Sequence, residues 1–441
     1  MHLIRALFTS HSCYNCAMRV LFISANQTEI NMRTAPLGLA CVAQALKQAG
    51  HDVRILDLMD VAEVSESLSG VIRHVRPEAI GISLRNIDDQ SMGSAHSFLT
   101  EANAIIGEVK SLSSAPIILG GAGYSIFPES VLERSCADMG ICGEGEEPFR
   151  LLVERIGGKQ PLGDIPGLYV RGKGLQGARS FVRDLDRFPL PHGRLLSMAE
   201  GGEATLPVQT RRGCPFGCSY CSTASIEGRT VRRRSPKKVV EWIARWTEEH
   251  VRQLYFVDNT FNLPASYAKN LCRELAAATC GVSWRCIIYP FRMEEGLAAL
   301  MAEAGCTEAS VGFESGCERI LRTMNKRFGL DDITHTRAVL RKFDIRCMGF
   351  LLLGGPGETR DSVKESLAFA DSLDLDALKV TIGIRIYPGT PLAVHARTEG
   401  VIAARDDLLF PRFYMAPGLE DWVRETVAAY AENRPNWIVD R

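Results

Sequence analysis

Three closely spaced cysteines constrain the middle of this chain more than any other feature. Cys214, Cys218 and Cys221 stand at C-x3-C-x2-C spacing in a loop with glycine and proline, directly after an apolar run at 206–210 that predicts a strand. Cysteine thiolates hold iron–sulfur clusters, normally four thiolates to a cluster. Three thiolates this close together can hold three corners of a [4Fe–4S] cluster and leave one iron open to bind and activate a ligand.

Two simpler interpretations of this loop are a zinc site and three thiols that never meet. Zinc requires a fourth ligand, and the nearest histidines along the chain are His192 and His250. The 14 cysteines are scattered over 441 residues, which is not the pattern of a disulfide framework. A cluster-binding triad also needs a reducing compartment, so we expect a cytoplasmic protein.

The loop resembles that of the radical S-adenosylmethionine (SAM) superfamily, whose three-cysteine signature it matches together with Tyr220, the aromatic residue before the third cysteine. The resemblance implies that the three cysteines bind a [4Fe–4S] cluster whose fourth iron chelates SAM. It also implies that Phe216 and Tyr220 lie against the cofactors. One electron, from a donor such as flavodoxin or ferredoxin, would then cleave SAM to methionine and a 5′-deoxyadenosyl radical, which abstracts hydrogen from the substrate.

The overall composition is that of an ordinary globular protein, with 46% hydrophobic residues, 23% charged residues and a net charge of −1. No apolar run reaches the roughly 18–20 residues that span a bilayer, and no excess of positive charge points to nucleic acid. We therefore expect neither a membrane nor a nucleic-acid partner. Residues 1–17, with Cys13 and Cys16, are expected to be a disordered extension, or translation begins at Met18.

Strands and helices alternate through residues 18–160, which favours a doubly wound, Rossmann-like parallel sheet with crossover helices. Ligands of such sheets bind beyond the carboxyl ends of the strands. Two of those ends are followed here by glycine-rich turns, at 120–123 and 143–146. Helices are expected at 36–49 and 92–112, and strands at 20–24, 53–58, 79–84, 116–119 and 139–142.

The order of landmarks in this half resembles the cobalamin-binding domain in front of class B radical SAM enzymes. The landmarks are Pro36-Leu37-Gly38-Leu39-Ala40, Gly50-His51-Asp52-Val53, Gly81-Ile82-Ser83-Leu84-Arg85-Asn86, Gly120-Gly121-Ala122-Gly123 and Gly143-Glu144-Gly145-Glu146. The resemblance implies that cobalamin is contacted by Ser83, Gly120, Gly121, Gly143, Glu144, Gly145 and Glu146. The loop 25–33 lacks the histidine that coordinates cobalt in many such domains. Arg85 or Asn86 is therefore expected to face the lower side of the corrin; alternatively, Arg85 pairs with Asp88 or Asp89 at the surface.

Residues 161–205 are expected to form a proline-stiffened connector with a hairpin between 168–171 and 180–182. A second alternation over 206–395 fits a partial (β/α)6 barrel of TIM type, whose functional groups stand at the carboxyl ends of the strands. Residues 396–441 are expected to form a short cap, over the barrel mouth or on the barrel bottom. Barrel strands are expected at 206–210, 253–257, 283–289, 308–313, 347–353 and 378–386.

Polar residues follow the second and fourth of these strands. By resemblance, Asp258 or Asn259 would hold the amino group of SAM; alternatively, Asp258 caps the next helix. Glu314, followed by Ser315, would contact the ribose or the methionine part of SAM. A carboxylate at a barrel strand end is costly unless it is paired or accepts hydrogen bonds.

The fifth and sixth strands also end in candidate site residues. Gly354 begins a run that is similar to the glycine motif on the adenine side of SAM, and Arg385 would meet a carboxylate through two hydrogen bonds. The alternative for Arg385 is pairing at the surface. The run Arg232-Arg233-Arg234 is expected to be a solvated segment, not a nucleic-acid patch.

Together the two resemblances imply a cobalamin-dependent radical SAM enzyme whose cofactors are a [4Fe–4S] cluster, SAM and cobalamin. The leading hypothesis is methylation of an unactivated carbon, or of phosphorus, in a small-molecule substrate, with methylcobalamin delivering the methyl group. One alternative is cobalamin-dependent radical chemistry without methyl transfer, such as oxidative cyclisation or rearrangement. The other is a non-catalytic cobalamin carrier or sensor, which would need neither the complete triad nor Asp258 and Glu314.

Overall fold

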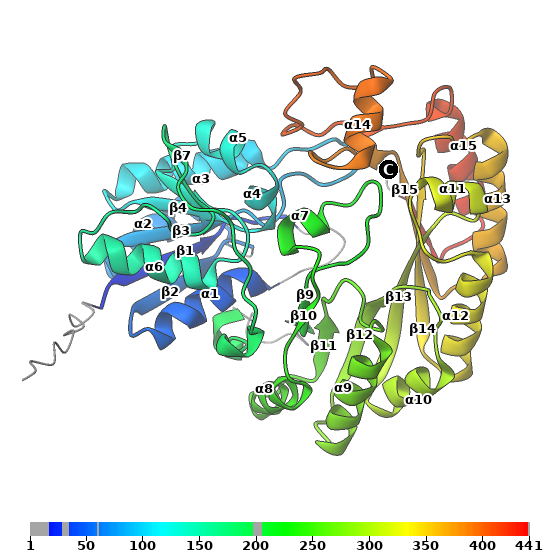
Figure 1. Cartoon of the computed structure of the whole chain (residues 1–441), viewed down its shortest axis with the longest axis horizontal. Coiled ribbons are helices and arrows are strands. Elements are labelled where there is room, and N and C mark those ends of the chain that lie inside the picture. The colour runs from blue at the N-terminus through cyan, green and yellow to red at the C-terminus, as the bar shows by residue number, and fades with distance from the viewer. Residues whose placement is uncertain (1–16, 29–34, 60, 197–204, 440–441) are drawn as a thin grey trace, which may run out of the picture.

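The computed structural model describes residues 17–28, 35–59, 61–196 and 205–439, which form two α/β domains side by side (Figure 1). Each domain is built on one seven-stranded sheet. The expected extension, with Cys13 and Cys16, lies outside the described residues except for Ala17. No helix within the described ranges is long and apolar enough to cross a membrane.

The first sheet has the strand order β2-β1-β3-β4-β5-β6-β7, in which β1 to β5 are parallel and β6 and β7 are antiparallel. Helices cover both faces, so a strand such as β1 is apolar on both sides and fully buried after its first residue. The bounds are β1 Arg19–Ser24, α1 Leu37–Gln48, β2 Asp52–Asp57, α2 Val64–Val75, β3 Ala79–Ser83, α3 Leu99–Leu112, β4 Ile117–Gly120, α4 Ala122–Ile126, α5 Pro128–Glu133, β5 Met139–Ile141, α6 Glu146–Gly157, β6 Leu168–Val170 and β7 Gly174–Leu175.

The second sheet has the order β18-β15-β14-β13-β12-β11-β8, and every neighbouring pair is parallel. It curves into an open barrel with helices outside (Figure 1). The bounds are β8 Thr205–Val208, β9 Arg211–Arg212, α7 Thr223–Glu227, β10 Arg232–Arg233, α8 Pro236–Glu248, β11 Gln253–Phe256, α9 Ala265–Ala277, β12 Ser283–Ile288, α10 Glu295–Glu303, β13 Cys306–Glu314, α11 Glu318–Thr323, α12 Leu330–Lys342, β14 Arg346–Leu353, α13 Arg360–Ser372, β15 Ala377–Ile382, β16 Ile384–Arg385, α14 Pro391–Thr398, β17 Phe413–Tyr414, α15 Glu420–Ala431 and β18 Trp437–Val439.

Three local expectations differ from the structure. The helix expected from residue 92 begins only at Leu99, because the preceding loop reaches the barrel, where Met92 packs against Gly383. The expected hairpin is tighter, since β6 pairs directly with β7 and Phe181 lies outside it. The strand expected at 378–386 stops at Ile382, where Gly383 takes a positive φ of 81° and a new short strand begins.

Buried ion pairs join the two domains. Arg212 contacts Glu146 at 2.5 Å and 3.2 Å, and Arg232 contacts Glu144 at 2.6 Å. Burial disfavours the charged forms, but the attraction between Arg212 and Glu146 outweighs it, raising the pKa of the arginine and lowering the pKa of the glutamate. The expectation that 232–234 is a solvated run is therefore wrong, because Arg232 and Arg234 are both buried and only Arg233 is exposed.

A second junction lies where the loop after β3 meets the barrel. Asp88 is buried and contacts Arg385 Nε at 2.8 Å. The other two guanidinium nitrogens donate to the carbonyls of Ile386 and Leu408. A more exposed pair, Arg134 with Asp407 at 2.9 Å, also links the domains.

We expect Asp88→Ala to lower the free energy of unfolding by about 3–5 kcal/mol, because it leaves the buried Arg385 without its counter-charge. The matched control is Asp407→Ala, which removes the exposed carboxylate and should cost about 1 kcal/mol or less. Urea unfolding followed by tryptophan fluorescence measures both. Equal losses of unfolding free energy in the two variants would contradict a buried junction between Asp88 and Arg385.

Candidate active site

The cysteine loop lies at the carboxyl end of β8 and is anchored to the barrel. Gly213 opens the loop with a φ of 93°, and a side chain there would clash with the Thr230 carbonyl. The Cys214 N–H donates to the Gly228 carbonyl at 3.0 Å, and the Ser219 N–H donates to the Met324 carbonyl at 3.0 Å. The loop backbone is thus fixed on both sides of its cysteines.

The three cysteine side chains lie close enough to influence one another. Burial raises the pKa of the Cys214 thiol, and Cys221 and Cys218 raise it further. Among the described residues, no three His, Cys, Asp or Glu side chains are placed to share one metal ion. A cluster does not need such convergence, because each thiolate binds a different iron. The donor set, three free and partly accessible cysteines, therefore fits three corners of a [4Fe–4S] cluster.

Aromatic residues and one lysine surround the loop. Phe216 stacks on Tyr289, with ring centroids 4.1 Å apart. Tyr220 accepts a hydrogen bond from Lys326 Nζ at 3.0 Å, and the same ammonium contacts Glu314 Oε1 at 3.1 Å. Glu314 is thus paired, as a carboxylate at a strand end requires. Lys326 is a site residue that sequence reasoning missed, because no spacing pattern links it to the cysteines.

Asp258 and Asn259, which follow β11 after Val257, both have partners within the chain. The Asp258 carboxylate accepts from the N–H and the hydroxyl of Thr210 at 2.7 Å and 2.5 Å, and from the Arg211 N–H at 3.1 Å. It fixes the chain entering the cysteine loop and does not cap α9. Asn259 donates to Glu227 Oε2 at 2.9 Å, and Glu227 also accepts from the Gly213 N–H. Both Asp258 oxygens therefore already accept hydrogen bonds from Thr210 and Arg211, and the contact of Asp258 or Asn259 with the amino group of SAM stays a prediction.

Three other predicted contacts also have different surroundings. Ser315 is fully buried, and its hydroxyl shares a hydrogen bond of 3.0 Å with the Ser366 hydroxyl. Gly354 lies against Met415 of the C-terminal segment. Arg385 does meet a carboxylate, but it is that of Asp88, at 2.8 Å. For Arg385 the carboxylate is thus supplied by the chain itself, from a segment distant in the sequence. Contacts of Ser315 and Gly354 with SAM stay predictions.

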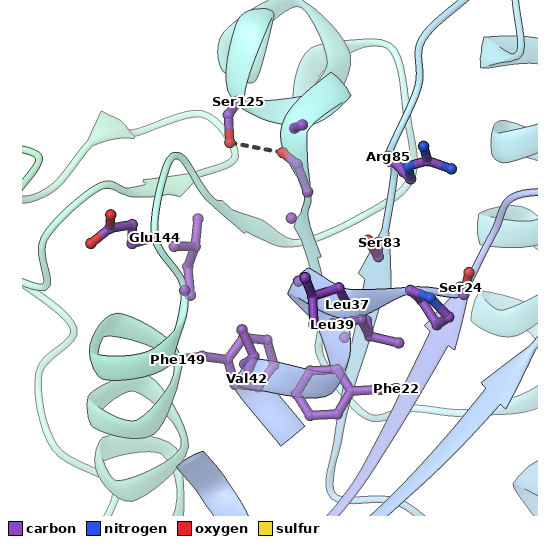
Figure 2. Close-up of a pocket in the computed structure, with 18 of the residues that line it drawn as sticks. Phe22, Ser24, Leu37, Leu39, Val42, Ser83, Arg85, Ser125, Glu144 and Phe149 are labelled. Atoms are coloured by element: carbon purple, nitrogen blue, oxygen red, sulfur yellow. Dashed lines mark hydrogen bonds between the residues drawn. The ribbon is translucent and has the colours of Figure 1, made fainter. Parts of the chain in front are cut away.

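A cavity of about 280 Å³ opens at the carboxyl edge of the first sheet (Figure 2). Its apolar floor includes Phe22 and Phe149, with ring centroids 4.9 Å apart, beside Val42. Its rim carries the Ser83 and Ser125 hydroxyls. The apolar floor fits the aromatic base on the tail of cobalamin, and the rim hydroxyls fit the amides at the edge of its corrin ring. The predicted residues that line the cavity are Ser83, Arg85, Gly120, Gly121, Gly143, Glu144, Gly145 and Glu146.

Some details of the cavity differ from the sequence expectation. Asn86 is not among the described lining residues, and neither is any histidine. Asp88, proposed as a partner of Arg85, is instead the partner of Arg385. The carboxylates of Glu144 and Glu146 reach the cavity wall but pair with arginines of the barrel.

Gly120→Leu should abolish cobalamin binding without unfolding the protein. A β-carbon at Gly120 has no atom within 4 Å, so the added side chain would occupy empty cavity. Gly107→Leu in α3 is the matched control, because Gly107 also has open space beside it and does not line the cavity. Absorbance of the co-purified corrinoid measures binding, and retention of cobalamin by Gly120→Leu would contradict this site.

Glu358, in the glycine motif after β14, should make stability depend on pH. Burial raises its pKa to about 7, although the Gly354 and Gly355 N–H groups donate to it. A carboxyl with a raised pKa favours folding when protonated, so wild-type stability should fall as pH rises from about 4.5 to 7, by about 3 kcal/mol. Glu358→Gln should therefore melt higher than wild type at pH 8 and close to it at pH 5. An equal difference in melting temperature between Glu358→Gln and wild type at pH 5 and at pH 8 would contradict this prediction.

The arrangement matches known families in both halves. The family model for the B12 binding domain matches residues 23–153, and that for the radical SAM superfamily matches residues 208–370. An uncharacterized methyltransferase of Pyrococcus horikoshii is 28% identical over 87% of this chain and 84% of its own length. The tryptophan 2-C-methyltransferase of Streptomyces laurentii is 25% identical over 86% of this chain and 75% of its own length.

The fold of the whole chain has a solved counterpart. A radical SAM methyltransferase from Kitasatospora setae, solved with cobalamin and a [4Fe–4S] cluster bound, superposes with a TM-score of 0.87 at 21% identity. The match covers 97% of this chain and 93% of the other. With the two family models, the cysteine loop and the cavity, this places the chain in the cobalamin-dependent radical SAM enzymes, whose cofactors are a [4Fe–4S] cluster, SAM and cobalamin.

Proposed function

We propose that this enzyme methylates an unactivated carbon, or a phosphorus, of a small molecule. The observation that carries the proposal is the short connection between the two cofactor sites. Helix α7 begins two residues after Cys221, and its last residues, Ile226 and Glu227, line the cobalamin cavity. A five-residue helix is about 7.5 Å long. The cluster loop and the cavity therefore lie at the two ends of one short helix, close enough to serve one substrate.

When bound, the cluster and SAM supply a 5′-deoxyadenosyl radical, and cobalamin supplies a methyl group for transfer. The chain contributes binding and positioning. Cys214, Cys218 and Cys221 would hold three irons and leave the fourth for SAM. Glu314 stands at the same barrel mouth, where it would contact the ribose or methionine part. Arg85 lines the cavity and would face the lower side of the corrin.

The names of the relatives support methyl transfer to a small molecule. Of the two sequence relatives described above, one is named for methylation of a carbon of tryptophan and the other as a methyltransferase. The substrate of the present enzyme would occupy the space between the barrel mouth and the corrin. The electron would come from a donor protein such as flavodoxin or ferredoxin, in the cytoplasm.

The triad should be essential for both SAM-dependent products. Anaerobic protein loaded with iron, sulfide and cobalamin, then given SAM and dithionite, should yield S-adenosylhomocysteine and 5′-deoxyadenosine. Cys214→Ala, Cys218→Ala and Cys221→Ala should lower 5′-deoxyadenosine at least 100-fold and lose bound iron, because no other described thiols stand at this loop. Cys280→Ala, in the barrel but away from the loop, is the matched control.

The products separate the alternatives. 5′-Deoxyadenosine without S-adenosylhomocysteine would contradict methyl transfer and favour cyclisation or rearrangement. Bound cobalamin with neither product, in protein that holds its cluster, would favour a carrier. Liquid chromatography with mass spectrometry detects both nucleosides.

A further inference from the structure

One short barrel segment holds the part of the cysteine loop that surrounds Cys218. This segment, residues 324–327, follows α11. The Met324 carbonyl accepts from the Ser219 N–H at 3.0 Å, and Asn325 Nδ2 donates to the Gly217 carbonyl at 2.7 Å. Lys326 Nζ then donates to the Tyr220 hydroxyl at 3.0 Å. Consecutive residues of the segment thus bind loop residues on both sides of one cluster ligand.

Arg327, the last residue of the segment, contacts two aromatic residues at the cysteine loop. The Arg327 N–H donates to the Tyr289 hydroxyl at 2.9 Å, and the Arg327 guanidinium lies 5.6 Å from the centre of the Phe216 ring. Phe216 is the ring that stacks on Tyr289. With its neighbours bonded in this way, the Lys326 ammonium has little freedom to move away from the loop.

The ammonium is buried and charged. The Lys326 side chain is only 4% exposed, and the Tyr220 and Phe328 ring centres lie 5.3 Å and 5.7 Å from Nζ. Burial alone would lower the pKa of Lys326, but Glu314, Tyr220 and Cys218 outweigh it and raise that pKa well above its usual value. A fixed positive charge therefore stands beside the cluster loop in a poorly solvated environment.

Glu314 is the second member of this charged pair. Lys326 Nζ contacts the cysteine loop directly, at the Tyr220 hydroxyl, and Glu314 Oε1 lies 3.1 Å from the same ammonium. The ammonium is therefore the charge of the pair that touches the cluster loop. Reduction adds one electron to a cluster, and a nearby positive charge favours the state with that electron.

We propose that Lys326 is a positioning residue that raises the reduction potential of the [4Fe–4S] cluster, with Glu314 as the opposing charge that limits the effect. In this step an external one-electron reductant transfers one electron to the oxidised cluster. No bond forms or breaks, and no proton is transferred. The inference rests on the cluster site proposed above. It does not depend on which substrate is methylated.

The test is a redox titration of the cluster in the full-length, cluster-loaded enzyme without SAM, with dithionite as reductant and the reduced cluster followed by electron paramagnetic resonance. Lys326→Met removes the charge and should make reduction at least tenfold less favourable, a shift of at least 59 mV to lower potential for one electron. Glu314→Gln removes the opposing charge and should shift the potential upward. Lys326→Arg keeps the charge and should stay near wild type.

Arg322→Met is the matched control. It removes a positive charge from the preceding helix, where the side chain is 71% exposed and screened by water. Its potential should equal that of wild type. Unchanged potentials in Lys326→Met and Glu314→Gln would overturn the proposal. If Lys326→Met does not retain iron, Glu314→Gln decides alone, and its unchanged or lowered potential would overturn the proposal. The methyl-transfer assay reads different quantities, so failure of the proposed function would be seen separately.

Discussion

The two-domain arrangement depends on guanidinium groups that are buried between the domains and fully paired. Arginine keeps its charge under all ordinary conditions, so it can be buried only where carboxylates and carbonyls meet its donors. Arg212 and Arg232 find those partners in Glu144 and Glu146, on the turn after β5. A different docking angle would leave several buried charges without partners, and the domains therefore have one preferred relation.

The same turn also forms a wall of the cobalamin cavity. Gly143 has a φ of 97° and lies close to the Arg179 side chain, and the carboxylates that follow point toward the barrel. Backbone from this turn faces the cavity while its charges hold the second domain. One short stretch of chain therefore both lines the cavity and holds the domain that carries the cysteine loop.

Much of this could be predicted from sequence because the signals are local. The alternation of apolar runs with helical segments predicted both sheets, and the spacing of Cys214, Cys218 and Cys221 predicted the loop. The hydrogen-bond partners of Asp258 and Ser315 could not be read in this way. Each partner lies about 50 positions away, Thr210 for the first and Ser366 for the second.

Charge runs were the least predictable feature. Arg232-Arg233-Arg234 looks like a solvated surface in any short window of sequence, since arginine is mostly exposed in proteins. Its burial follows from the connector, whose Leu185 and Phe188 carbonyls accept from Arg234, and from the turn after β5. Only the tertiary structure brings these groups together, as it also brings Lys326 to the cysteine loop.

The shared wall of the cavity has a thermodynamic consequence. Gln209, Arg212, Ile226 and Glu227 of the barrel side complete a cavity that otherwise belongs to the first domain. The whole binding surface exists only when the two domains are docked. Because a corrin binds this docked state, its binding shifts the equilibrium toward docking. At a free concentration of 100 times Kd this linkage amounts to about 2.7 kcal/mol. The cofactor is in this sense a structural tie between the domains as well as a reagent.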